Sequence, residues 1–215
     1  MVWMNFNKPL STKNIQYDPK YIPKVKSSEL KDLIQASYSR NNPARDIGKK
    51  YGYTLDDSLS NAEQKVFLDK DKNPKIVFTG SRKGADVLTD IALGAGLAGF
   101  TPRFQRSSAL VDKVKEKYKN RPITALGDSL GGSLAESVGG KVDKVITTSK
   151  GVGLFGIGKQ IRPNQTDIRA SNDAISVLRN TQSGGKKVTI KGTKGIFNPF
   201  ISHDYRNLDK IDKTF

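Results

Sequence analysis

Residues 123–132 read Ile-Thr-Ala-Leu-Gly-Asp-Ser-Leu-Gly-Gly, an apolar run that leads into a serine flanked by glycines at positions 127 and 131. The pattern Gly-x-Ser-x-Gly is typical of a sharp, strained turn between a β-strand and an α-helix. Larger side chains at the glycine positions would collide with the turn or with a neighbouring strand. With a helix predicted at Ser133–Val138, the pattern presents the Ser129 hydroxyl above a sheet. The alternative is an ordinary strand–glycine loop–helix connection.

The chain contains one histidine, His203, close to its C-terminus. A serine nucleophile needs a base of near-neutral pKa that takes its proton and returns it to the leaving group. If Ser129 is such a nucleophile, His203 has no competitor. The alternative is a histidine on a surface loop without a catalytic part. The order of the residues favours catalysis, because α/β-hydrolase triads run serine, acid, histidine along the chain.

The acid of such a triad should lie between the serine and the histidine, an interval that holds Glu136, Asp143, Asp167 and Asp173. Glu136 lies on the helix after the serine, and Asp143 precedes a predicted strand instead of following one. Asp173 follows the strand-like residues 166–170 and opens a new segment, which is where a triad acid belongs. We therefore predict Asp173 as the acid, with Asp167 as the second candidate.

Further segments extend the pattern. Residues 76–81 read Ile-Val-Phe-Thr-Gly-Ser and residues 86–91 read Asp-Val-Leu-Thr-Asp-Ile. They are similar to the strand and oxyanion turn V-A-F-R-G-[TS] and to the D-W-x-T-D-L of the class 3 (fungal-type) triacylglycerol lipases, in the α/β-hydrolase superfamily. Residues 127–135 match the G-H-S-L-G-G-A-L-A of the same family. Residues 172–175 resemble its N-x-x-D-P-V acid loop less specifically, and His203 falls where its histidine does.

This resemblance spans about residues 28–207 and implies a single α/β-hydrolase domain, with a mostly parallel central sheet flanked by helices. It implies a serine esterase that hydrolyses carboxylic esters of lipids, either acylglycerols or phospholipids. In such an enzyme backbone N–H groups stabilise the developing oxyanion. Leu130, directly after the nucleophile, supplies one of them, and the resemblance assigns the other to Ser81, whose hydroxyl adds a further bond.

The chain departs from the family pattern at three positions. Thr79, Asp128 and Val87 stand where the family has arginine, histidine and tryptophan. The first two leave the backbone of the two turns intact but change the side chains that form hydrogen bonds around the site. We expect these departures to affect substrate preference and activity level more than the triad.

The length of 215 residues suits one α/β domain with a substantial core. We predict an N-terminal arm at residues 1–26, which is polar and contains prolines, and a hydrolase-like domain at residues 27–215. The chain has no cysteine, which excludes disulfides and thiolate chemistry. With one histidine and no cysteine we expect neither a zinc site nor another metal or cofactor.

The sequence shows neither a membrane-spanning segment nor a signal peptide. No stretch approaches the length of a membrane span, and residues 1–10 lack the apolar region of a signal peptide. We therefore expect a cytoplasmic or peripheral membrane location, with export by a non-classical route as the alternative.

The formal net charge is +16. A positive surface attracts anionic phospholipid headgroups, at about 1 kcal/mol for each well-placed basic residue, or a nucleic-acid backbone. No nucleic-acid-binding motif is present, so an anionic lipid surface is the favoured partner. Two other functions stay open: a catalytically weak hydrolase fold that serves as a basic membrane- or nucleic-acid-binding module, and a triad used for another acyl transfer or for peptide hydrolysis.

The apolar periodicity predicts the remaining elements. Helices are expected at 28–38 and 107–119, and residues 41–59 as a polar connection. Residues 94–106 are a candidate flap over the site, and residues 151–158 a candidate lining of the acyl pocket or a membrane contact. Strands are expected at 64–69, 75–79, 123–126, 142–147, 166–170 and 187–190.

Overall fold

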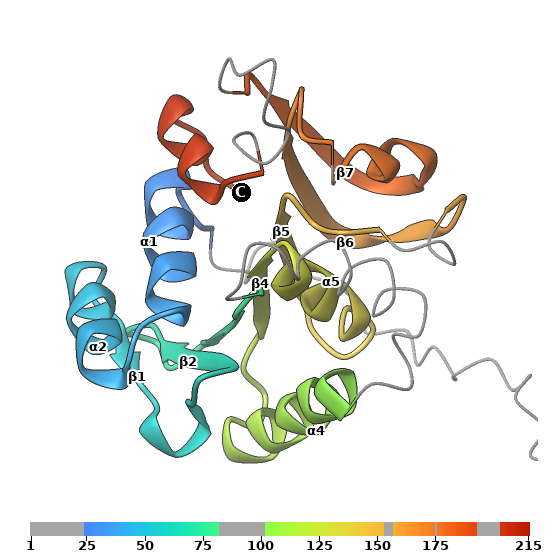
Figure 1. The fold of residues 1–215 in the computed structure, drawn as a ribbon. Helices are drawn as coiled ribbons and strands as arrows, with labels where there is room; N and C mark the ends of the chain where they lie inside the picture. Colours follow the sequence, from blue (N-terminus) through green and yellow to red (C-terminus); the bar gives the residue numbers. More distant parts are fainter. Residues whose placement is uncertain (1–23, 82–101, 153–156, 175, 193–202) are drawn as a thin grey trace, which may run out of the picture.

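The computed structural model describes residues 24–81, 102–152, 157–174, 176–192 and 203–215 (Figure 1). Within this part of the chain, seven strands form one sheet in the order of the sequence. The first two pairs are antiparallel and all later pairs are parallel. The strands are β1 (Thr54–Leu55), β2 (Gln64–Leu68), β3 (Pro74–Phe78), β4 (Thr124–Asp128), β5 (Lys144–Thr148), β6 (Gln160–Ala170) and β7 (Ser183–Ile190).

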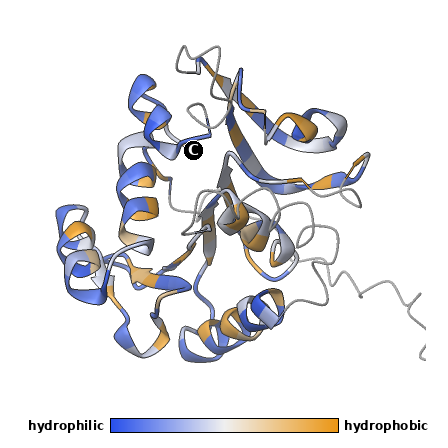
Figure 2. Cartoon of the chain, viewed as in Figure 1, coloured by the Kyte–Doolittle hydropathy of each residue, from blue (hydrophilic) through white to orange (hydrophobic). Residues whose placement is uncertain are grey.

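Helices cover both faces of the sheet, and they mix apolar and polar residues along their length (Figure 2). The apolar residues of α1 (Ser27–Ser37) and of the 3₁₀-helix η4 (Tyr205–Lys210) pack on one face, in a core with Leu126 and Ile146. Those of α4 (Pro102–Lys117) and α5 (Leu130–Ser137) pack on the other face. The fold is thus a three-layer α/β arrangement with a mostly parallel sheet, as predicted.

The structure differs from the sequence prediction in residues 41–59. The polar connection expected there contains the helix α2 (Asn41–Lys50) and the short 3₁₀-helix η1 (Asp57–Leu59). Only a narrow side of α2 is buried, through Ala44 and Gly48, and a Cβ on Gly48 would lie 2.9 Å from the Phe67 ring. So few apolar positions do not produce a helical pattern, and tertiary packing stabilises this helix.

Several elements begin earlier in the chain than predicted. Helix α4 begins at Pro102, where proline suits the first helical turn, so residues 102–106 of the candidate flap are helical and Phe104 is buried. The rest of that candidate, residues 94–101, lies outside the described residues. Strands β6 and β7 begin earlier than predicted. They continue pairing across a register shift between Ile161 and Thr166, and such a shift leaves no alternating pattern in the sequence from which it could be predicted.

The ends of the described chain pair with each other. Val25 and Phe215 exchange two backbone hydrogen bonds of 2.9 and 2.8 Å, and Val25 is fully buried. The C-terminus accordingly lies beside α1 (Figure 1). Val25 thus packs with the domain, although it belongs to the arm predicted at residues 1–26; residues 1–23 of that arm lie outside the described part.

Candidate active site

The predicted strand–serine–helix unit is present at the end of β4. Ser129 has φ 55° and ψ −123°, a conformation that L-residues adopt rarely. A Cβ on Gly127 would lie 2.1 Å from the carbonyl oxygen of Gly131, and one on Gly131 would lie 2.3 Å from the carbonyl oxygen of Phe78. Both contacts are too short for any side chain, so glycine is required on each side of the serine.

Three side chains selected from the sequence lie in contact at this turn. The Nε2 atom of His203 is 2.9 Å from Ser129 Oγ, and its Nδ1 atom is 3.0 and 3.1 Å from the two carboxylate oxygens of Asp173. Ser129 and Asp173 are buried, and the side chain of His203 is 7 % exposed. The arrangement can move a proton from the serine hydroxyl to the imidazole, with a carboxylate behind it.

Asp173 is held by a residue that the sequence analysis did not identify. The Ser176 hydroxyl donates to Asp173 Oδ2 at 2.6 Å, and the backbone N–H of Ser176 donates to Oδ1 at 3.2 Å. Ser176 begins the 3₁₀-helix η3 (Ser176–Thr181). An aspartate three residues before a serine at a helix start is a local capping pattern, so this signal was available in the sequence.

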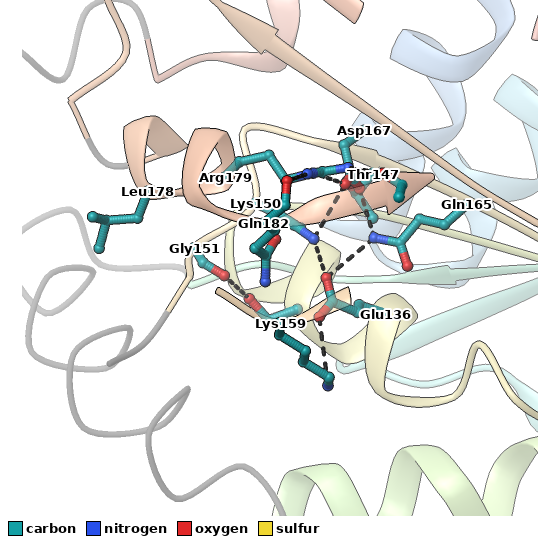
Figure 3. A network of polar contacts seen from close by, with 12 residues as sticks. Glu136, Thr147, Lys150, Gly151, Lys159, Gln165, Asp167, Leu178, Arg179 and Gln182 are labelled. Carbon is teal, nitrogen blue, oxygen red and sulfur yellow. Dashed lines mark hydrogen bonds and ion pairs between the residues drawn. The ribbon is translucent and has the colours of Figure 1, made fainter. Parts of the chain in front are cut away.

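The second candidate acid, Asp167, does not contact His203 among the described interactions. It belongs to a buried network with Lys150, whose Nζ atom is 3.2 Å away, and with Arg179, whose Nε donates to it (Figure 3). Lys150 in turn pairs with Glu136, and Asp143 accepts from the backbone N–H of Ile123 at 2.7 Å. The three alternative acids are therefore engaged elsewhere, and Asp173 is the carboxylate at the histidine.

The turn at residues 79–81 lies beside Ser129 and is held there by hydrogen bonds. It contains Ser81, the predicted oxyanion donor. The Thr79 hydroxyl donates to the carbonyl oxygen of Ser37 at 2.9 Å, and the Gly80 N–H donates to the hydroxyl of Tyr38 at 3.1 Å. A Cβ on Gly80 would lie 2.8 Å from the Asp128 carbonyl oxygen, so the two turns are in close contact. Ser81 follows directly and is half-buried.

The second predicted donor, Leu130, is the first residue of α5, so its N–H has no acceptor within the helix. It therefore points out of the helix N-terminus at the serine turn, where donors to an oxyanion are needed. The roles of Leu130 and Ser81 stay predictions.

Tyr38 connects this turn to the histidine segment, and the sequence analysis missed it. Its ring stacks on that of Tyr205 with centroids 6.3 Å apart, and Tyr205 lies two residues after His203. Burial, together with the charge of Asp128, raises the pKa of Tyr38, so its hydroxyl stays protonated at neutral pH. Tyr38 and Gly80 are 42 positions apart, so no local sequence pattern predicts their contact.

Replacing Tyr38 by phenylalanine should destabilise the turn. Tyr38→Phe keeps the stacked ring but leaves the buried Gly80 N–H without its acceptor, at a cost of about 1–3 kcal/mol in the free energy of unfolding. If the turn carries an oxyanion donor, its displacement should lower kcat by about 10-fold to 100-fold. Urea unfolding and steady-state kinetics measure the two effects.

Tyr205→Phe is the matched control, because within the described residues no hydrogen bond of the Tyr205 hydroxyl is recorded. It should change both quantities little. Equal effects of the two substitutions would show that ring packing, and not the hydrogen bond to Gly80, matters.

The charges at the site act on one another. Burial lowers the pKa of His203, but the hydrogen bond with Asp173 and the charges of Asp128, Asp173 and Asp204 outweigh burial, so this pKa is raised. Burial raises the pKa of Asp173, but its hydrogen bonds and the charge of His203 prevail and hold that pKa below its usual value. The site thus favours an imidazolium beside an ionised Asp173.

Two structural features are absent from the described residues. Within the described residues, no three histidine, aspartate or glutamate side chains gather as metal ligands. No helix in this part of the chain has the length and apolar character needed to cross a membrane.

No family model and no curated protein sequence matches the chain. Solved structures do match it. The Lip2 lipase of Yarrowia lipolytica aligns with a TM-score of 0.54 at 15% identity, over 82% of this chain and 80% of that chain. A lipase of Rhizomucor miehei gives 0.46 at 14% identity over 69% and 59% of the two chains. A triacylglycerol lipase of Penicillium expansum gives 0.45 at 13% over 79% and 82%.

The alignment with Lip2 extends over most of both chains. Together with the sheet and the serine turn, it shows that this chain has an α/β-hydrolase fold. The chain shares this fold with Lip2, in agreement with the fold that the sequence resemblance implied.

Proposed function

We propose that the protein is a serine hydrolase that cleaves carboxylic ester bonds of lipids. The observation that carries this proposal is the hydrogen-bonded chain from Ser129 through His203 to Asp173 at a strand–helix turn. The short distances support the roles of nucleophile, base and orienting carboxylate, in the order that acyl transfer needs. The fold shared with Lip2, a protein described as a lipase, supports lipid esters as the substrate class.

In this mechanism Ser129 Oγ attacks the acyl carbonyl while its proton passes to His203 Nε2. The carbonyl oxygen becomes an oxyanion and accepts hydrogen bonds from the N–H groups of Leu130 and Ser81. Collapse of this intermediate expels the alcohol, which takes the proton from His203, and leaves an acyl-serine. A water molecule then attacks the carbonyl of the acyl-serine while His203 takes its proton. The bond to Ser129 Oγ breaks, Oγ takes the proton back from His203, and the carboxylic acid leaves. Asp173 fixes the tautomer and stabilises each imidazolium.

A substrate panel tests the reaction class. Acylglycerol emulsions, phospholipid vesicles, short p-nitrophenyl esters and peptide amides should be compared in wild type, with the Ser129→Ala protein as the blank. We expect hydrolysis of the esters and none of the amides. Amide cleavage above the blank would favour peptide hydrolysis, and a wild type equal to the blank on every ester would favour a catalytically inactive binding module.

We also propose an anionic lipid surface as the place where the protein meets its substrate. The net charge of +16 supports this, as does the exposure of Val177, at 44 %, on the helix that follows the acid Asp173. Ile157, in the candidate membrane contact at residues 151–158, is 47 % exposed; residues 153–156 lie outside the described part.

Vesicle binding should rise with the anionic lipid fraction and weaken as salt is raised, because the attraction extends only about a Debye length, ~8 Å at physiological ionic strength. Co-sedimentation with neutral and anionic vesicles over a salt series measures this. Equal binding to both kinds of vesicle at every salt concentration would overturn the lipid-surface proposal. Tighter binding to DNA than to vesicles would assign the positive charge to nucleic acid.

A further inference from the structure

Asp128 is a buried carboxyl group next to Ser129 that the mechanism above does not use. Side chains alternate along a strand, and Leu126, two residues earlier, packs in the core beneath α1 and η4. The Asp128 side chain therefore points to the same face of the sheet. Its contact agrees with this placement: the hydroxyl of Thr148, aligned with Asp128 on β5, donates to Oδ1 at 2.6 Å.

The ionisable groups that interact with Asp128 come from several segments of the chain. The charge of Asp128 raises the pKa of Tyr38, at the end of α1, and that of Tyr205, on η4. The charges of His203, Asp204 and Asp173 act on Asp128 in turn. The His203 ring lies next to this position, since its Nε2 atom is 2.9 Å from Oγ of Ser129, the residue that follows Asp128. Among these described groups only His203 can become positive, so it is the one that an ionised Asp128 attracts.

We propose that Asp128 is a second carboxylate partner of His203, a positioning residue that stabilises the imidazolium from beneath the serine turn. This inference rests on the proposed function, in which His203 becomes an imidazolium whenever it takes a proton from Ser129 or from water. Asp173 fixes the ring through a direct hydrogen bond at Nδ1. Asp128 acts through charge alone, in a buried setting where water screens it weakly.

The pH dependence of the site follows from this pairing. Burial raises the pKa of Asp128 to about 6, while the charge of His203 and the Thr148 hydrogen bond lower it and the charges of Asp204 and Asp173 raise it. Asp128 is thus ionised at neutral pH and supports the imidazolium there. The two groups titrate as a coupled pair, because the charge of each favours the opposite charge on the other.

The test is Asp128→Asn, which keeps the shape and an oxygen that accepts from Thr148 but removes the charge. His203 is the only histidine in the chain, so its imidazole resonances identify themselves in an NMR titration. We expect the pKa of His203 to fall by about 1 unit. Asp57→Asn is the control, since this carboxylate is 51% exposed and pairs with Arg45; it should leave the pKa of His203 unchanged.

The kinetic consequence separates a role in charge from a role in packing. The acid limb of kcat/KM reports the free enzyme's base, so in Asp128→Asn it should move to lower pH together with the NMR pKa. The value of kcat at the plateau should fall by about 10-fold, a loss of about 1.4 kcal/mol of transition-state stabilisation. Packing damage alone would lower kcat without moving the limb, and that result would overturn the proposal.

Failure of the proposed function is distinguishable. A protein that hydrolyses no ester but shows the NMR shift refutes catalysis and leaves the Asp128–His203 interaction standing. An unchanged His203 pKa in Asp128→Asn refutes the interaction, whatever the activity. If that variant does not fold, the wild-type Asp128 carboxyl can be followed by ¹³C NMR: a two-step titration coupled to His203 is expected, and one simple step near the ordinary value, about 3.9, would overturn the inference.

Discussion

Ser129→Ala should reduce ester hydrolysis by a factor on the order of 10⁶, the largest effect of any single substitution in this chain. Without the hydroxyl no acyl-enzyme forms, and only binding and the oxyanion donors remain to assist water. His203→Ala should have a similar effect, and the double variant should be little worse than either, because the two residues act in one step. Initial rates on a soluble p-nitrophenyl ester measure this.

Ser137→Ala is the matched control. Ser137 ends the same helix, α5, and among the described residues its hydroxyl donates only to the Leu134 carbonyl oxygen, at 2.6 Å. Its removal should leave the rate within about twofold of wild type, since exposed substitutions rarely cost more than about 0.5 kcal/mol. A Ser129→Ala protein that keeps a tenth or more of the wild-type rate would exclude an acyl-serine mechanism.

Asp167→Asn should have the largest effect on stability. The side chains of Asp167 and Arg179 are both 2% exposed, and that of Lys150 is 1% exposed. The substitution leaves both cations buried without this carboxylate, and breaking such a pair costs about 3–5 kcal/mol. Because a domain is stabilised by only about 5–15 kcal/mol, the urea midpoint should fall steeply.

Asp112→Asn tests whether burial is the cause. Asp112 pairs with Lys141 at 2.6 Å, but the two side chains are 59% and 39% exposed. A surface pair of this kind contributes about 0–1 kcal/mol, so this variant should unfold close to the wild-type midpoint. An equal loss of stability in both variants would contradict the conclusion that the buried network stabilises the packing of η3 and α5 on the sheet.

The serine turn could be predicted because its chemistry is local. Gly127 and Gly131 are required by backbone contacts that any side chain would violate, so the pattern in the sequence and the geometry have one cause. The position of Asp173 beside His203 could be predicted for a similar reason. Asp173 follows the end of β6, and loops at the carboxyl ends of parallel strands meet at one edge of the sheet, where Ser129 also lies.

Other parts of the site depend on contacts between distant segments. The hydroxyl of Tyr38 reaches Gly80 across 42 residues, and nothing near either residue indicates it. The partners of Asp167 come from β5, the segment directly after it, β6 and η3, so in the sequence this buried network looks like scattered surface charges. Helix α2 could not be predicted for the same reason: it is mostly polar, and its narrow buried side depends on contacts with distant segments.

The central claim is that Ser129 is a nucleophile activated by His203, and a fluorophosphonate probe tests it most directly. The probe reacts covalently with an activated serine hydroxyl, and mass spectrometry locates the modified residue. We expect one label per chain, on Ser129, and none in Ser129→Ala. The labelling reaction should become slower as the pH falls through the pKa of His203. Folded wild-type protein that takes up no probe, or that carries it on a residue other than Ser129, would contradict the account.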